Sequence, residues 1–472
     1  MSSSADRNSR VLIVTYAFPP VAYVGVFRTL KYCKYLGGHH WTPVVLTARP
    51  GKGTFIDENL CRQIPPDTRV HRTLDVDPAK WLARLSRPKP RPAATVTDAR
   101  TAASGMPEAS SDGQPARRDG LWKRFKRFVH TLLTASPDSH IFWVPFAFLR
   151  GAWILLRERI DVIYCTSPPH SSHLAAFLLA RCFRKPYVLD FRDPWYVLGS
   201  AKNPGPKVPW LLRLETRTKA AIVRNAARII CVSRGERDEL REEFPEIDPR
   251  RITFITNGYD APDFEGVEPE RDDTNKLVLI HAGTIYPEVA GEFFEALRRL
   301  HAEDPAAAAG LEVRLLGEIS DDYTPTVQEL EALGLVRVYG MQPHRRTVSM
   351  MLGSDVLVIL MGGSKYRPSH LPSKGFEYLY AGKPILAIAR EGELAEMMRR
   401  SGLGIVASPD SVDGITQALR DLCRDHAAGR LQRTPDRAYI ASFDRTALAA
   451  KLASVLDEVR LEEQGRPLRQ ES

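Results

Sequence analysis

The sequence predicts an α/β protein in which two doubly wound domains, each built on a parallel sheet, face each other across a cleft. Two series of short apolar runs, one within residues 1–260 and one within residues 275–440, alternate with helical patterns. Such alternation is typical of parallel strands covered by helices on both faces. Residues 259–275, between the two series, are rich in Asp, Glu and Pro, and they are expected to form an interdomain linker. The carboxyl ends of both sets of strands would then line the cleft.

The individual elements follow from the apolar runs and their spacing. The first domain opens with a strand, a loop, a helix and a second strand, at residues 11–15, 16–25, 28–36 and 43–47. Its later strands are expected at residues 162–166, 187–190, 229–232 and 252–255, with helices at 173–181 and 210–225. The second domain is expected to have strands at residues 277–281, 312–316, 336–339, 356–360 and 385–388. Residues 441–472 carry a last helix, at 445–460, and a tail.

The first domain also contains a segment that does not fit a compact fold. Residues 87–119 are rich in Pro, Ala, Ser, Arg and Asp, which predicts a disordered insertion. Residues 120–134 then combine an apolar helical face with a cluster of Lys and Arg, the pattern of a helix lying in a membrane interface. The alternative is a helix docked on its own domain with a basic outer face. Residues 141–156 are expected to form a core helix, or else to extend the membrane-facing surface.

Composition limits the classes of partner. The chain has 472 residues, 43% hydrophobic content and a net charge of +9, which favours phosphates, nucleic acid or an anionic membrane face. Nucleic acid is the weakest of these, because the basic residues concentrate in one short segment and no base-reading module is present. Six scattered cysteines without a C-x-x-C pair indicate reduced thiols rather than disulfides or zinc. With no signal peptide and no long apolar stretch, the expected location is cytoplasmic.

The most informative stretch is residues 371–386, which predicts a loop, a short helix and a strand. Ser373 is a good N-cap, and Gly382 is expected to end the helix. The helix N-terminus with Ser373 and Lys374 offers backbone N–H groups, a dipole and a cation to a phosphate. Glu377, one turn further along, can accept hydrogen bonds from a diol such as ribose. The alternative is a capped surface helix with a solvated Lys374–Glu377 pair.

Three motifs of the first domain follow predicted strands, where a doubly wound fold binds its ligands. The first strand is followed by Tyr-Ala-Phe-Pro-Pro at residues 16–20 and then by Gly25 and Arg28, although Arg28 is equally compatible with an exposed helix position. Residues 165–173 contain His170 and His173. A single His there is usually a helix cap, but two of them close to the Asp-Phe-Arg-Asp-Pro-Trp run at 190–195 favour a functional role.

These motifs resemble those of family-four retaining glycosyltransferases of the GT-B fold, of the group-1-like, cell-surface polysaccharide type. The resemblance is carried by residues 16–28, 165–173, 190–195 and 371–386. It implies a GT-B architecture of two Rossmann-like domains, with an acceptor-binding domain at 1–260 and a nucleotide-sugar domain at 275–440. It also implies that the C-terminal helix within 441–472 packs back on the first domain.

The resemblance also implies roles for individual residues. Glu377 would hold the nucleotide ribose, and the turn before it the diphosphate. Relatives carry another Glu where this chain has Ser369, and that Glu touches the donor sugar. The implied donor-binding residues are Gly283, Thr284, Tyr339, Gly340, Ser369, Ser373, Lys374 and Glu377. The implied catalytic residues are His173, His170 and Asp193, and the acceptor or phosphate loop comprises Gly25, Arg28 and Arg192.

The leaving diphosphate requires a nearby cation. Relatives often place an Arg-Lys pair after the Gly283 turn, whereas this chain has Pro287 and Glu288. The cation is therefore expected from Lys374, from Arg28 or from the basic residues within 365–367. No carboxylate cluster has a metal-ligand spacing, so we expect a metal-independent enzyme without a cofactor, in which positive side chains and helix dipoles stabilise the leaving group.

The predicted function is that of a hexosyltransferase-like enzyme. It would move a sugar from a nucleotide-diphosphate donor to a lipid-linked or saccharide acceptor in cell-surface polysaccharide or glycolipid biosynthesis. It would act in the cytoplasm, on the anionic inner face of the plasma membrane. Two alternatives remain open: a sugar-nucleotide epimerase of the same fold, and a catalytically silent homologue that binds a partner and regulates assembly.

Overall fold

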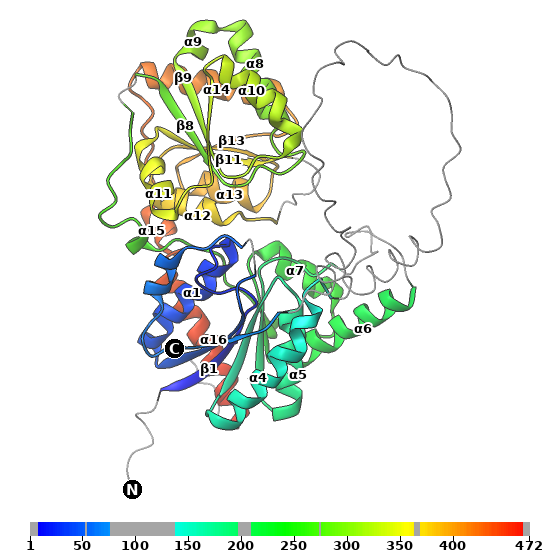
Figure 1. Cartoon of the computed structure of the whole chain (residues 1–472). Coiled ribbons are helices and arrows are strands. Elements are labelled where there is room, and N and C mark those ends of the chain that lie inside the picture. The colour runs from blue at the N-terminus through cyan, green and yellow to red at the C-terminus, as the bar shows by residue number, and fades with distance from the viewer. Residues whose placement is uncertain are drawn as a thin grey trace, which may run out of the picture.

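The computed structural model describes residues 8–51, 54–75, 137–196, 209–272, 275–362 and 369–465. These residues form two lobes, each a parallel sheet with helices on both faces, which lie one above the other in Figure 1. The predicted α/β class with two doubly wound domains is confirmed. The predicted insertion at 87–119, the amphipathic helix at 120–134 and the basic residues at 365–367 lie outside the described residues.

The first lobe contains a seven-stranded sheet in the order β3-β2-β1-β4-β5-β6-β7. All of its strand pairs are parallel, and β1 lies between β2 and β4, where the direction of strand addition reverses. Its strands are β1 Ser9–Val14, β2 Trp41–Ala48, β3 Arg69–Thr73, β4 Val162–Ser167, β5 Tyr187–Phe191, β6 Arg228–Cys231 and β7 Ile252–Phe254. The ligand site of such a sheet is expected beyond the carboxyl ends of its strands.

The second lobe repeats this plan with six parallel strands in the order β10-β9-β8-β11-β12-β13. Its strands are β8 Leu277–Ala282, β9 Leu311–Leu316, β10 Val336–Gly340, β11 Val356–Met361, β12 Ile385–Ala389 and β13 Gly404–Ala407. Here β8 lies at the reversal point, between β9 and β11, and the loop after it contains Gly283 and Thr284.

Helices connect the strands of both lobes. Those of the first lobe are α1 Val24–Leu36, α4 Val144–Arg157, α5 Ser171–Phe183, α6 Pro209–Asn225 and α7 Arg234–Glu243. Those that follow are α8 Gly291–Glu303, α9 Pro305–Ala309, α10 Thr324–Ala332, α11 His344–Gly353, α12 Ser373–Ala381, α13 Glu393–Arg400, α14 Val412–Ala427, α15 Arg437–Ala441 and α16 Arg445–Glu463. Single 3₁₀ turns occur at Gly37–His39, Glu58–Gln63, Ile141–Trp143, Pro249–Arg251, Ala261–Asp263 and Asp321–Tyr323.

The sequence analysis did not predict two of the strands. β3 (Arg69–Thr73) and β13 (Gly404–Ala407) are edge strands, each paired on one side only. Four of the five residues of β3 and three of the four residues of β13 are not fully buried. β3 has the sequence Arg-Val-His-Arg-Thr and lacks the continuous apolar run that marks a central parallel strand, and β13, Gly-Ile-Val-Ala, is apolar but only four residues long.

The last helix joins the two lobes. Although α16 follows the second lobe in sequence, its Leu448, Leu452 and Leu456 pack in the core of the first lobe, together with Val11 and Leu30. Figure 1 shows α16 lying beside α1 and β1. Where the chain returns, Tyr259 and Asp444 form a β-bridge, so both crossings between the lobes run side by side.

A buried ion pair holds α1 against β5. The Arg28 guanidinium donates to both carboxylate oxygens of Asp190, at 2.8 and 3.0 Å, and to the carbonyls of Ile255 and Thr256. Asp190 also accepts a hydrogen bond from the Tyr164 hydroxyl. Arg28 and Asp190 are 1% and 0% exposed, so neither charge is solvated and each depends on the other.

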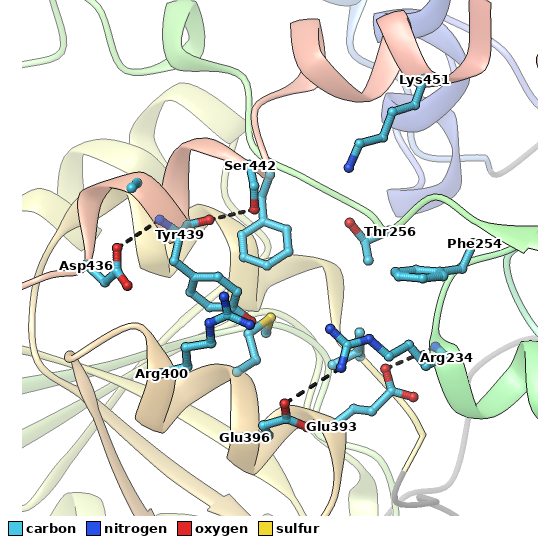
Figure 2. A pocket seen from close by; sticks show the side chains of 14 residues that line it. Arg234, Phe254, Thr256, Glu393, Glu396, Arg400, Asp436, Tyr439, Ser442 and Lys451 are labelled. Atoms are coloured by element: carbon cyan, nitrogen blue, oxygen red, sulfur yellow. Dashed lines mark hydrogen bonds and ion pairs between the residues drawn. The ribbon is translucent and has the colours of Figure 1, made fainter. Parts of the chain in front are cut away.

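The lobes touch again around α13. The Glu393 carboxylate of α13 accepts hydrogen bonds from the backbone N–H groups of Arg234, at 3.0 Å, and Gly235, at 2.6 Å, at the start of α7. Figure 2 shows this contact at one side of a cavity of about 460 Å³, with the Arg234 guanidinium reaching toward Glu396. Since a carboxylate is stabilised at a helix N-terminus, this contact favours the approach of the two lobes.

Replacing Asp190 by alanine tests the buried pair. Arg28 would be left as an uncompensated buried charge, so we expect the first lobe to lose about 3–5 kcal/mol of unfolding free energy. All seven tryptophans lie between residues 41 and 210, so tryptophan fluorescence during urea unfolding reports on this lobe. Glu246→Ala, which removes the exposed partner of Arg224, is the control and should leave the unfolding curve unchanged.

Candidate functional site

Two adjoining cavities lie in the cleft between the lobes. The first, of about 180 Å³, is lined by Glu377, Lys374, His344, Gly317 and Arg445, among others, and we call it the Glu377 cavity. The second, of about 450 Å³, is lined by Glu236, Asp193, Arg192, His281 and His370, among others, and we call it the Glu236 cavity. Both share the residues Ala282, Gly283, Thr284, Ser373 and Lys374.

The shared wall consists of the loop after β8 and the start of α12. Gly283 and Thr284 follow the reversal-point strand, as the sequence predicted. Ser373 is the first residue of α12 and not its N-cap, which is Pro372, and no side chain caps this helix. The helix ends as predicted at Gly382, whose φ of 70° is the left-handed conformation that glycine adopts readily. The backbone N–H groups at the start of α12 therefore have no side-chain acceptor.

Glu377 lies in a compact charge cluster. Its carboxylate accepts a hydrogen bond from Lys374 Nζ at 2.8 Å, and His344 Nε2 lies 3.4 Å from the other oxygen. Burial alone would raise the pKa of Glu377, but Lys374 and then His344 hold this pKa below its usual range. The carboxylate is thus ionised and oriented at neutral pH, which suits it to accept hydrogen bonds from hydroxyl groups.

Arg445 is a cation of the site that the sequence analysis missed. It begins α16, where the chain returns to the first lobe, and it is 5% exposed. Its Nη1 atom has no hydrogen-bond partner among the described residues, and the side chain lines the Glu377 cavity. Because α16 lies far from α12 in the sequence, no local pattern could indicate that they share a cavity.

Arg28 does not lie in the cleft, where the predicted acceptor or phosphate loop would place it. Each of its three guanidinium nitrogens donates to Asp190 or to a backbone carbonyl, and its side chain lines neither cavity. Gly25, predicted to lie in a loop, belongs to the first turn of α1 and lines the Glu236 cavity. A Cβ on Gly25 would lie 1.3 Å from Arg192 Nη1, so glycine makes room for this guanidinium. Arg192 is itself held by the Ser167 and Pro168 carbonyls.

The two histidines that were predicted to be catalytic do not line the cavities. His173 is fully buried and packs edge-on against Phe191, and burial lowers its pKa to about 4. His170 stacks on Trp195, with ring centroids 4.7 Å apart, and burial also lowers its pKa well below the ordinary value. Neither side chain lines either cavity, so both rings stand as neutral packing groups in this conformation. Asp193, by contrast, lines the Glu236 cavity.

The remaining predicted donor residues lie near the edges. Tyr339 is the residue before the end of β10, and the Arg337 guanidinium lies 5.2 Å from its ring centre. Gly340 ends the strand with φ of 64°, and its carbonyl accepts the N–H of Gly317, a lining residue. Ser369 packs closely against Gly235 of the first lobe. A Cβ on that glycine would lie only 2.4 Å from the Ser369 Cβ. These three residues line neither cavity directly.

Within the described residues, no group of three or more His, Cys, Asp or Glu side chains is arranged to hold a metal ion. In the same part of the chain, no helix is both long and apolar enough to cross a bilayer.

Comparison with known proteins agrees with this architecture. Residues 109–262 match the family model Glycosyltransferase Family 4, and no curated protein matches the chain. HepE from Anabaena, solved with UDP and glucose, has a TM-score of 0.56 at 15% identity, covering 95% of this chain and all of that one. Sucrose-phosphate synthase from Thermosynechococcus elongatus reaches 0.60 at 14% identity, covering 96% and 99%. A UDP-N-acetylglucosamine 2-epimerase reaches 0.50 at 13% identity, covering 98% and 99%.

These likenesses establish the GT-B fold, which the sequence predicted. At such low identity they carry no information on substrate or mechanism. The family match lies mainly in the first lobe and includes the motifs around His170 and Asp193.

Proposed function

We propose that this protein is a glycosyltransferase that moves a sugar from a nucleotide-diphosphate donor to an acceptor hydroxyl. The observation that carries the proposal is the Glu377 cavity. It combines an uncapped helix N-terminus, the ionised Glu377, the cation Lys374 and the buried Arg445 at the carboxyl ends of a doubly wound sheet. Such a combination suits a nucleoside diphosphate, whose phosphates take N–H groups and cations while its ribose takes a carboxylate.

In this proposal Lys374 and Arg445 supply the positive charge that a leaving diphosphate requires. Arg445 takes the place expected for Arg28, because the Arg28 guanidinium is already bonded on all three nitrogens. The bond between the anomeric carbon and the diphosphate oxygen would break, the acceptor oxygen would bond to the same face of that carbon, and the proton of the acceptor hydroxyl would pass to the leaving diphosphate. We infer that these cations and the dipole of α12 suffice without a metal ion or a cofactor.

The acceptor would enter beside Gly25, Arg192 and Asp193, on the first-lobe side of the Glu236 cavity. We propose a lipid-linked or saccharide acceptor of the kind used in cell-surface polysaccharide or glycolipid synthesis. The epimerase alternative shares the fold but needs no acceptor, so incubation with a nucleotide sugar alone separates the two. A new sugar nucleotide would indicate an epimerase. Binding without conversion or transfer would indicate a silent homologue.

Glu377→Ala should weaken nucleotide binding at least tenfold and abolish transfer, because the ribose loses an ionised acceptor. The wild type, incubated with UDP-, GDP-, ADP- and dTDP-sugars and a polyprenyl-phosphate-linked saccharide, should release nucleoside diphosphate and form one glycoside. The anomeric configuration of that product, measured by NMR, tests retention. Absence of both nucleotide binding and transfer in the wild type would contradict the proposed function.

Arg445→Gln should reduce the affinity for nucleoside diphosphates about tenfold or more, since it removes a charge-assisted hydrogen bond. Titration calorimetry with the diphosphate and with the uncharged nucleoside separates this effect from ribose contacts, because only the diphosphate should lose affinity. Lys451→Gln is the matched control. It removes a cation from the same helix on the side of the cavity in Figure 2 and should change neither affinity. Equal losses for both ligands would contradict a phosphate contact.

We also propose peripheral binding to an anionic membrane face. Support comes from α4, where Leu149, Trp153 and Leu156 are 68%, 42% and 74% exposed, and the guanidinium groups of Arg150 and Arg157 lie 4.4 and 6.0 Å from the Trp153 ring centre. Apolar side chains flanked by arginines suit the boundary between acyl chains and anionic headgroups.

Changing Leu149, Trp153 and Leu156 together to serine should reduce co-sedimentation with phosphatidylglycerol vesicles severalfold, because the inserted apolar surface is lost. The control changes Trp210 and Leu214 of α6 to serine, which removes similarly exposed apolar surface elsewhere. Deleting residues 118–134 tests the predicted amphipathic segment in the same assay. Sedimentation that is unchanged in both the α4 variant and the deletion would contradict membrane binding.

A further inference from the structure

Two side chains that line the Glu236 cavity each carry a buried polar atom with no hydrogen-bond partner among the described residues. The atoms are Oε2 of Glu236, from the first lobe, and Nε2 of His281, from the second. The two side chains are 7% and 8% exposed. Buried polar atoms in folded proteins are nearly always hydrogen-bonded, and the exceptions often mark the place of a ligand or a water molecule.

The chemistry of His281 is fixed by its other nitrogen. Nδ1 lies 2.9 Å from the Val358 carbonyl oxygen, which can only accept, so Nδ1 carries the proton and Nε2 is a free acceptor. Burial lowers the pKa of His281 to about 4, and the ring is neutral at pH 7. A Cβ on Gly283 would lie 3.4 Å from Nε2, so a larger residue at this position would pack against the atom.

Glu236 is held from its backbone side. Ser233 caps α7 by accepting a hydrogen bond from the Glu236 N–H at 3.1 Å. The backbone of Val232 acts to lower the pKa of the Glu236 carboxyl group, and Oε2 has no hydrogen-bond partner among the described residues. Burial and then the charge of Asp193 raise the pKa of Glu236 to about 9. Oε2 therefore belongs to a neutral acid at pH 7, which can donate as well as accept.

The two lobes touch next to Glu236. Glu393 of α13 binds the N–H groups of Arg234 and Gly235, directly before Glu236. Gly235 also packs against Ser369 of the second lobe. Glu236 therefore directly follows a contact between the two lobes.

We propose that Glu236 and His281 recognise hydroxyl groups of the transferred sugar and so determine which sugar the enzyme accepts. The inference rests on the proposed function and names two specificity-determining residues within it. A phosphate does not fit these atoms, because phosphate oxygens accept hydrogen bonds and His281 Nε2 can only accept. Arg192, the cation on the first-lobe side of this cavity, already donates to two backbone carbonyls. A neutral polyhydroxyl ring offers both donors and acceptors and fits the cavity.

The test compares two ligands on the full-length protein by titration calorimetry. The probes are UDP, GDP, ADP and dTDP, and the sugar conjugates UDP-glucose, GDP-mannose, ADP-glucose and dTDP-glucose. Glu236→Ala and His281→Asn should each weaken the conjugate about three- to tenfold, the loss of one hydrogen bond, and leave the free diphosphate unchanged. In His281→Asn the side-chain amide can still donate to the Val358 carbonyl, while the acceptor at Nε2 is gone.

Two further variants exclude a merely structural role. Glu236→Gln keeps a neutral group with a donor and an acceptor, so it should retain most of the conjugate affinity at pH 7. Wild-type affinity should fall as the pH rises toward 9, where Glu236 ionises, and that of Glu236→Gln should not. Glu242→Ala, an exposed position on the same helix, should have no effect.

Equal weakening of diphosphate and conjugate, or no weakening of either, in both Glu236→Ala and His281→Asn would overturn this inference and leave the proposed function intact. A wild type that binds no nucleoside diphosphate would contradict the proposed function itself, and the inference with it.

Discussion

The return of α16 into the first lobe is the constraint on which the site depends. Leu448, Leu452 and Leu456 pack in the first-lobe core with residues of β1 and α1, so the end of the chain that follows the second lobe is anchored in the first. The chain crosses twice at one place, through the bridge between Tyr259 and Asp444. As a result the carboxyl ends of both sheets face one cleft. Arg445, the residue after the bridge, lines the Glu377 cavity in this cleft.

Two cations near the cleft are paired with carboxylates, and a third has a donor atom that is unpaired in the described part of the chain. Arg28 is neutralised by Asp190 and Lys374 by Glu377, whereas Nη1 of Arg445 has no partner among the described residues. A buried cation with an unused donor is costly, and an anionic ligand at Nη1 would offset that cost. In the Glu236 cavity, by contrast, burial keeps the side chains of His281 and Glu236 neutral. The two adjoining cavities therefore differ in the kind of ligand group that they suit: charged in one, neutral and polar in the other.

Position 369 has a serine where a carboxylate is expected. The resemblance to family-four glycosyltransferases leads one to expect a carboxylate there for the donor sugar, and this chain has Ser369. Ser369 packs against Gly235, and the next residue of the first lobe, Glu236, brings a carboxyl group into the same cleft. A contact made within one domain in relatives would here be made across the two lobes, so that sugar recognition would require closure.

The sequence by itself determined eleven of the thirteen strands, the short helix that ends at Gly382 and the placing of Lys374 beside Glu377, because these depend on local periodicity and on residues one helical turn apart. It missed the edge strands β3, which is mostly polar, and β13, which has only four residues. Only the tertiary structure decided which arginine is free. Arg28 and Arg445 have the same side chain, yet one meets Asp190 and two carbonyls whereas the Nη1 of the other meets none, because hydrogen-bond partners are assigned by contacts between segments far apart in the chain.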